Sequence, residues 1–114
     1  MHEMSLAISI VDLAVEQLSR EGGRRVIEVD IEVGSLAGVL LDSLEFCLEA
    51  ASRSTPLAEA DFKLTPVMAR GECASCQRGF EADSFFAPCP ACGDICPAIS
   101  GGRELKVRSL TIED

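Results

Sequence analysis

The stretch Cys73–Cys92, CASCQRGFEADSFFAPCPAC, contains two Cys-x-x-Cys motifs separated by twelve residues. Two cysteines three positions apart on a tight turn can place both sulfurs on one metal ion, and two such turns complete a tetrahedron of thiolates. The segment is too short, and too interrupted by glycine and proline, to bury a core, so we expect metal binding to supply its folding free energy. The predicted zinc ligands are Cys73, Cys76, Cys89 and Cys92.

The predicted site has a closed shell of four thiolates. Such a shell leaves no coordination position for a substrate, so the site is expected to be structural or regulatory rather than hydrolytic. Spacing alone leaves an iron site of the rubredoxin type open. Cys96 lies four residues beyond Cys92 and is interpreted as a bystander, with a role in ligand exchange or redox sensing as the alternative.

The composition of the chain limits its partners and its compartment. Its 114 residues suit one small domain with a metal-stapled subdomain. The formal net charge of −9 disfavours nucleic acid and anionic membranes, so neither is an expected partner. The first ten residues lack the basic start of a signal peptide, and no apolar run is long enough to span a bilayer. Paired cysteines then point to the reducing cytoplasm and to metal binding rather than disulfides.

Hydrophobic periodicity predicts two helices and three strands. The face of the first helix that should be buried includes Met4, Ile8 and Val11. In the first strand, Ile27, Val29, Ile31 and Val33 should be buried, while Glu28, Asp30 and Glu32 form a solvated face. The predicted helices are 4–21 and 42–53, and the predicted strands are 26–33, 62–71 and 104–113.

Local signals refine these elements and their arrangement. Asp42 is the predicted N-cap of the second helix, and a change of apolar phase predicts a bulge near Arg108-Ser109. The strands that flank the cysteine module are expected to pair antiparallel. The predicted fold is α/β (α+β), with a small three-stranded mixed sheet, two helices and an inserted zinc-ribbon-like subdomain of four cysteines. Its predicted division is 1–71 with 103–114, and 72–102.

The opening Met1-His2-Glu3 carries a second metal-binding signal. His2 is the only histidine of the chain, and an isolated terminal histidine is usually a solvated side chain. However, an α-amine, an amide nitrogen and an imidazole can close adjacent chelate rings on one ion, and Glu3 can complete the plane. Planar, nitrogen-rich coordination suits Ni²⁺ or Cu²⁺ rather than Zn²⁺.

These features together resemble one family over essentially the whole chain. The opening Met-His-Glu, the strand ending at Gly34, the Cys-x-x-Cys…Cys-Pro-x-Cys-Gly module and the closing Gly102-x-Glu104-Leu105 are similar to the HypA/HybF nickel metallochaperones of NiFe-hydrogenase maturation. The resemblance implies a nickel site at Met1, His2 and Glu3, transported Ni²⁺ and structural Zn²⁺ on the four cysteines. The protein is expected to be a monomer or a weak homodimer in the cytoplasm. It implies a HypB-type GTPase and the precursor of the NiFe-hydrogenase large subunit as partners. Some members add a ligand before the second helix, for which Asp42 is the nearest candidate.

Other functions are less consistent with the residues. No nucleophile–base pair can be built from a single terminal histidine, and the chain has no glycine-rich phosphate loop, so no enzymatic activity is expected. The alternatives are a zinc-ribbon interaction or scaffold module without a nickel function and a rubredoxin-like electron carrier. Phe80, Phe85 and Phe86 are interpreted as a cover for the zinc site or as packing at the junction of the subdomain.

Overall fold

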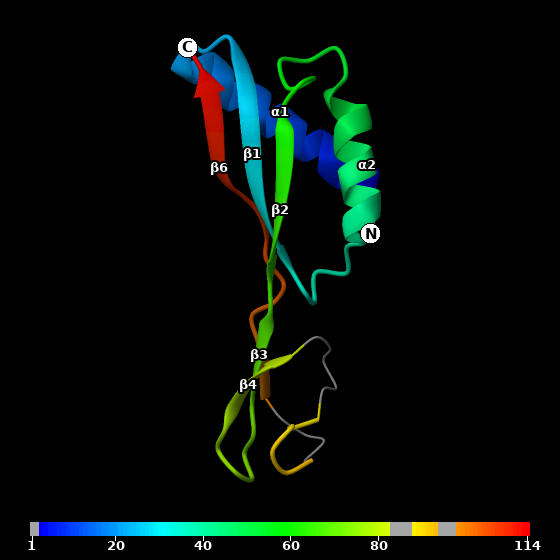
Figure 1. The fold of residues 1–114 in the computed structure, drawn as a ribbon, viewed down its shortest axis with the longest axis vertical. Coiled ribbons are helices and arrows are strands. Elements are labelled where there is room, and N and C mark those ends of the chain that lie inside the picture. The colour runs from blue at the N-terminus through cyan, green and yellow to red at the C-terminus, as the bar shows by residue number, and fades with distance from the viewer. Residues whose placement is uncertain (1–2, 83–87, 94–97) are drawn as a thin grey trace. The chain divides into compact units, whose positions relative to one another are not determined.

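The computed structural model of the protein describes residues 3–82, 88–93 and 98–114 (Figure 1). The chain forms two compact units. The helix–sheet unit comprises residues through Glu32, 39–65 and 106–114, and the cysteine unit comprises 33–38 and the described part of 66–105. The elements are α1 (Glu3–Glu21), β1 (Arg25–Gly34), α2 (Leu41–Ser52), β2 (Asp61–Val67), β3 (Ala69–Glu72), β4 (Gly79–Ala82), β5 (Ala98–Ser100) and β6 (Leu105–Glu113).

The larger sheet has the strand order β2-β1-β6. β1 and β2 run in the same direction and β6 runs against them, which makes the sheet mixed (Figure 1). The predicted fold class is therefore confirmed: two helices, a three-stranded mixed sheet and a separate small sheet that carries the cysteines. The expected pairing of the two strands that flank the module is wrong, because β1 lies between β2 and β6.

The predicted strand 62–71 is also corrected, because it forms two strands in different sheets. β2 ends at Val67 and β3 begins at Ala69. Pro66 lies within β2, which is an edge strand of the larger sheet, and an edge strand tolerates a residue that has no N–H to donate. The chain thus changes from one sheet to the other at Met68, two residues after this proline.

The apolar face of the larger sheet does not follow strict alternation. Val26 is 1% exposed and Ile27 is 40% exposed, so the prediction that Ile27 is buried is wrong. From Val29 onward the predicted alternation holds, with Val29, Ile31 and Val33 buried. β6 shows the phase change that was predicted, since the adjacent residues Arg108 and Ser109 are both exposed. The two neighbouring strands therefore both change phase.

The helices of the helix–sheet unit pack against each other. Met4 and Ile8 were predicted to be buried and are 40% and 48% exposed, because the covered stripe of α1 is rotated toward Ile10. The predicted N-cap is also wrong: α2 is preceded by Leu40, which makes no side-chain cap, and Asp42 lies in the first helical turn. A carboxylate in that turn still stabilises the helix through the macrodipole. The buried residues of α1 are Ala7, Ile10, Val11, Ala14 and Leu18.

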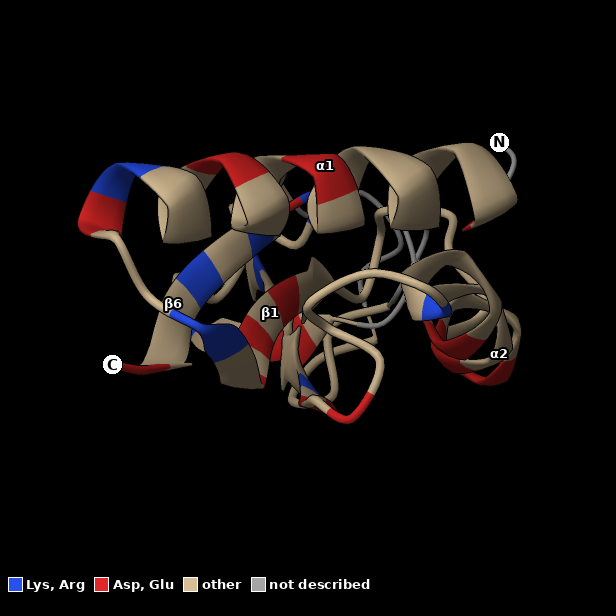
Figure 2. Ribbon diagram, turned by 90° about the horizontal axis from the view of Figure 1, so that it is seen from above, with Lys and Arg blue, Asp and Glu red and all other residues tan. Residues whose placement is uncertain are grey.

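The strands β1 and β6 of the larger sheet carry residues of opposite charge (Figure 2). Asp30 accepts a hydrogen bond from the hydroxyl of Thr65 at 2.7 Å and lies 4.0 Å from the guanidinium of Arg108. Lys106 lies 3.4 Å from a carboxylate oxygen of Glu32. Two carboxylates of β1, those of Asp30 and Glu32, thus lie close to cations of the neighbouring strand β6 (Figure 2).

The cysteine unit is built on a small antiparallel sheet of order β4-β3-β5. The segment 33–38 belongs to this unit although it follows β1 directly in the chain. The amides of Gly34, Ser35 and Leu36 donate hydrogen bonds to the carbonyls of Glu104, Val67 and Gly102 at 2.6, 2.8 and 2.5 Å. Within the described residues, no helix has the length and apolar character needed to cross a membrane.

Candidate metal centre

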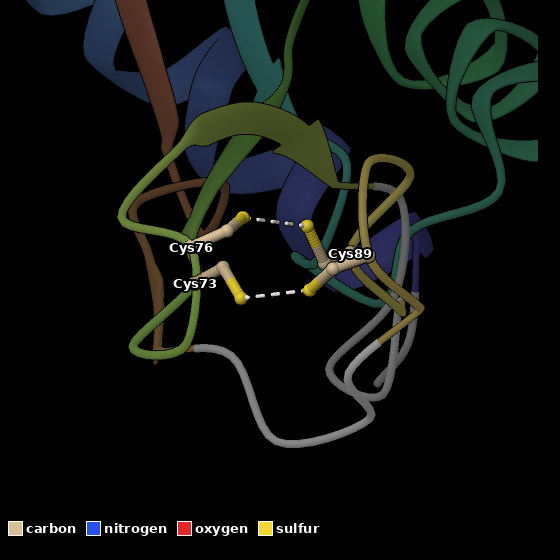
Figure 3. A group of neighbouring side chains, drawn as sticks. Cys73, Cys76 and Cys89 are labelled. Atoms are coloured by element: carbon tan, nitrogen blue, oxygen red, sulfur yellow. Dashed lines mark hydrogen bonds between the residues drawn. The ribbon is translucent and has the colours of Figure 1, made fainter.

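The four cysteines of the two motifs converge on one point of the cysteine unit. Their sulfur atoms all lie within 4.8 Å of one another, with Cys73 3.4 Å from Cys92 and Cys76 3.6 Å from Cys89 (Figure 3). A zinc ion bound tetrahedrally by four sulfurs at about 2.3 Å sets sulfur–sulfur edges of about 3.8 Å. The thiols are therefore spaced as a four-coordinate zinc site requires. Cys96 lies outside the described residues.

Two similar turns present these cysteines. In each turn the amide four residues after the first cysteine donates to that cysteine's carbonyl: Gln77 to Cys73 at 2.7 Å and Gly93 to Cys89 at 2.8 Å. Both donors have a positive φ, +61° for Gln77 and +78° for Gly93. Glycine adopts this conformation without penalty, whereas a residue with a Cβ is strained there. This backbone requirement was not predicted from the sequence, although the Cys-Gly at the end of the second motif is a visible signal of it.

The first cysteine of each turn is the more deeply placed. Cys73 and Cys89 are 1% and 2% exposed, while Cys76 is half-buried and Cys92 is exposed. The group therefore has two thiols inside the unit and one at its surface. Phe80 is half-buried, and its ring lies against Gly71, its cross-strand partner on β3. Phe85 and Phe86 lie outside the described residues.

The thiols of the cluster differ in acidity. Backbone N–H groups, first that of Cys92 and then that of Ala91, stabilise the thiolate of Cys89 against the effect of burial and lower its pKa from 9.0 to about 7. For Cys76, the N–H of Arg78 acts in the same direction, but burial and thiol hydrogen bonds outweigh it, and the pKa is raised. Metal ligation requires the thiolate, so Cys89 offers a ligand close to neutral pH without the help of an ion.

A serine outside the cysteine motifs connects two strands of the small sheet that carries the cysteines. The hydroxyl of Ser35 accepts a hydrogen bond from the amide of Ala69 at 3.1 Å and donates one to the carbonyl of Ala82 at 3.2 Å. Ala69 and Ala82 are cross-strand partners at the end of the β3–β4 ladder, and both are buried. The Ser35 hydroxyl therefore bridges the two strands at this pair. We call this arrangement the Ser35 bridge.

The residues predicted to bind nickel lie mostly outside the described part of the chain. Met1 and His2 are not described, and Glu3 is the half-buried first residue of α1. Asp42 is exposed in the first turn of α2. Among the described residues, the four cysteines are the set of three or more potential metal ligands that the structure brings together.

Comparisons with known proteins by sequence and by fold all point to the same protein family. Residues 1–112 match the family model described as "Hydrogenase/urease nickel incorporation, metallochaperone, hypA". Proteins named hydrogenase maturation factor HypA from Chlorobaculum tepidum and Geobacter metallireducens are 45% and 43% identical, each over 99% of this chain and 100% of their own length. The solution structure of the Ni metallochaperone HypA from Helicobacter pylori has a similar fold, with a TM-score of 0.68, 20% identity and coverage of 99% and 98% of the two chains.

Proposed function

The chain belongs to the HypA family of nickel metallochaperones for hydrogenase maturation. From this premise we propose where the protein binds nickel and which proteins are its partners in nickel delivery. The match over residues 1–112 carries the proposal, because it includes both the opening Met-His-Glu and the cysteine motifs. Ni²⁺ is the cargo, and the four-cysteine site is the resident metal centre. The family is described as metallochaperones rather than as catalysts.

The proposed nickel site is formed by Met1, His2 and Glu3. Nitrogen ligands from an amine, a backbone amide and an imidazole, with a carboxylate nearby, form the donor set that Ni²⁺ favours. Each nitrogen must lose a proton before it binds the ion, so nickel affinity should fall as the pH falls. Nickel would occupy the part of the chain formed by 1–71 and 103–114.

The proposed zinc site is formed by the four cysteines, within residues 72–102. Four thiolates hold Zn²⁺ in a closed shell, which supplies folding free energy and no open coordination position. The chain's own backbone prepares this site through the two turns and the Ser35 bridge. The four thiols are kept reduced in the cytoplasm, which we propose as the compartment of the protein.

The proposed partners are a HypB-type GTPase and the precursor of the NiFe-hydrogenase large subunit. Support for them comes from the role of the family in nickel incorporation. The family description includes urease as well as hydrogenase, so nickel supply to urease is consistent with the same site. The net charge of −9 favours a basic docking surface on each partner.

Nickel titration followed by calorimetry tests the proposed site. The wild type is compared with His2→Ala and with a chain extended by one residue before Met1, each loaded with zinc. The substitution removes the imidazole and the extension removes the α-amine from its position, so both should weaken nickel binding. Equal nickel affinity in all three proteins would refute the site and would favour a zinc-dependent interaction module without a nickel function.

A further inference from the structure

The strand β6 forms an open edge of the larger sheet. It lies at one end of the order β2-β1-β6, so β1 pairs with one side of it, and no other described strand pairs with the opposite side. β6 is nine residues long and contains no proline. An open edge of this length presents unpaired N–H and C=O groups, which can pair with the strand of another chain.

A shallow trough runs along this edge between β6 and α1. Its volume is about 480 Å³. Its lining is partly polar, with residues such as Glu21 and Arg108, and partly apolar, with Val107, Leu110 and Ile112 of β6. Leu13 of α1 also lines it and is 53% exposed. A chain that paired with β6 would cover the apolar part of this lining with every second side chain. The edge and the trough thus form one surface, which we call the β6 edge.

The sequence of β6 is palindromic in polarity. From Leu105 to Ile112 the order is apolar, polar, apolar, polar, polar, apolar, polar, apolar. The structure follows this order, since the apolar positions are half-buried and the polar ones are exposed. Because of the phase change at Arg108-Ser109, the apolar residues before it and the apolar residues after it lie on the same face of the strand. The pattern therefore reads the same in both directions of the strand.

This palindrome fits a second copy of the same strand. In an antiparallel pair centred between residues 108 and 109, Val107 lies opposite Leu110 of the other copy, and Lys106 lies opposite Thr111. A shift of one residue in one direction would place Arg108 opposite itself, and like charges directly opposite are destabilising. A shift in the other direction would place polar residues opposite apolar ones. Only the central register matches polarity at every position.

We propose that a second copy of this chain occupies the β6 edge, as an antiparallel two-fold pair of β6 strands centred between Arg108 and Ser109. A two-fold interface uses the same patch on both partners, which a palindromic pattern satisfies by itself. The pair would continue the larger sheet across the two copies and cover both troughs. Because each copy carries a net charge of −9, association strengthens as salt screens the repulsion.

Register-specific cross-linking tests the proposal on the full-length, zinc-loaded protein. In the proposed pair, residues 106 and 111 of different copies are directly opposite, about 5 Å apart at Cα, which is within the range of a disulfide. Two residues 106 would be separated by about 17 Å, five residues along a strand. A mixture of Lys106→Cys and Thr111→Cys proteins should therefore form a cross-linked dimer under mild oxidation. Either variant alone should cross-link no faster than the wild type, which measures the background from the native cysteines.

Sedimentation velocity over about 10 µM to 1 mM supplies an independent measurement of the association. Leu110→Lys and Leu13→Lys place a charge in the trough and should weaken the dimer at least about tenfold. Phe46→Lys is the matched control, because Phe46 is an exposed apolar residue of α2 and is 66% exposed. Circular dichroism identifies any variant that fails to fold, and Leu13→Lys changes a side chain that is already half exposed. A monomer at every concentration, or a dimer whose mixture cross-links no faster than the single variants, would overturn the proposal.

Discussion

Replacement of Ser35 by alanine tests how the cysteine unit is held together beneath its metal site. The variant removes the Ser35 bridge, in which one hydroxyl serves the amide of Ala69 and the carbonyl of Ala82. Ala69 is 0% exposed and Ala82 is 1% exposed, so neither group has free access to water. A buried donor left without a partner costs about 1–3 kcal/mol. We therefore expect the folded cysteine unit to lose about 2 kcal/mol.

This loss should be measurable as zinc affinity. If metal binding supplies the folding free energy of the unit, destabilisation of the folded form reduces the apparent affinity by the same amount. A loss of about 2 kcal/mol corresponds to about 30-fold weaker binding. Competition with a chromophoric chelator at fixed pH gives the ratio for Ser35→Ala and the wild type directly.

The control for this variant is Ser9→Ala. The hydroxyl of Ser9 also donates to a backbone carbonyl, that of Ser5 at 3.0 Å, but it lies on the exposed surface of α1. Its removal should leave zinc affinity unchanged. A less than threefold effect of Ser35→Ala would refute the reasoning. It would mean either that the bridge contributes little or that the unit is folded without metal.

Three further predictions follow from contacts within single units. Gly34→Ala should destabilise the cysteine unit by more than about 2 kcal/mol, because a Cβ there would overlap the backbone of Gly102. Gly38→Ala is the control, because its Cβ would meet no atom and the substitution should cost only about 1 kcal/mol for the φ of +73°. Hydrogen exchange of the β3 amides compares the two variants, and equal protection in both would contradict the contact at Gly34. Glu113→Gln should lower the stability to urea at neutral pH but not at acid pH. The hydrogen bond and charge of Arg25 hold the pKa of Glu113 below its ordinary value, so this stabilisation is present above the unfolded-state pKa and is lost as the pH falls through the folded-state pKa; a pH-independent difference would rule out this origin. Cys73→Ala should abolish the hydrogen-exchange protection of the amides in β3 and β4, while the circular dichroism of the helices is retained, because the two units have separate cores. Loss of the helical signal would show that the two units fold together.

The sequence predicted the metal centre better than it predicted the sheet around it. The four cysteines follow a local spacing rule, and a tetrahedral site tolerates little variation in that spacing. The Ser35 bridge has no local signal, because its partners lie 34 and 47 residues away in the chain. Hydrogen bonds of this kind depend on tertiary structure, which a pattern of single residues does not encode.

The errors at Ile27, Met4 and Ile8 have a common cause. Periodicity identifies an apolar stripe but not which part of it the neighbouring elements cover. In β1 the buried face begins at Val26 and changes phase, and in α1 the covered stripe is rotated toward Ile10. The division of the predicted strand 62–71 is a separate case, because Pro66 lies within the edge strand β2 and the chain leaves that sheet only after Val67.

The assignment of residues 33–38 to the cysteine unit has a consequence for protein engineering. The chain passes between the two units four times, after Glu32, Gly38, Thr65 and Leu105. The metal-binding half is therefore not a cassette that can be excised as one continuous fragment. A graft of Pro66–Leu105 into another scaffold would leave behind Ser35 and the amides that hold Val67 and Gly102. A transplanted module would have to carry residues 33–38 as a second, separately encoded piece.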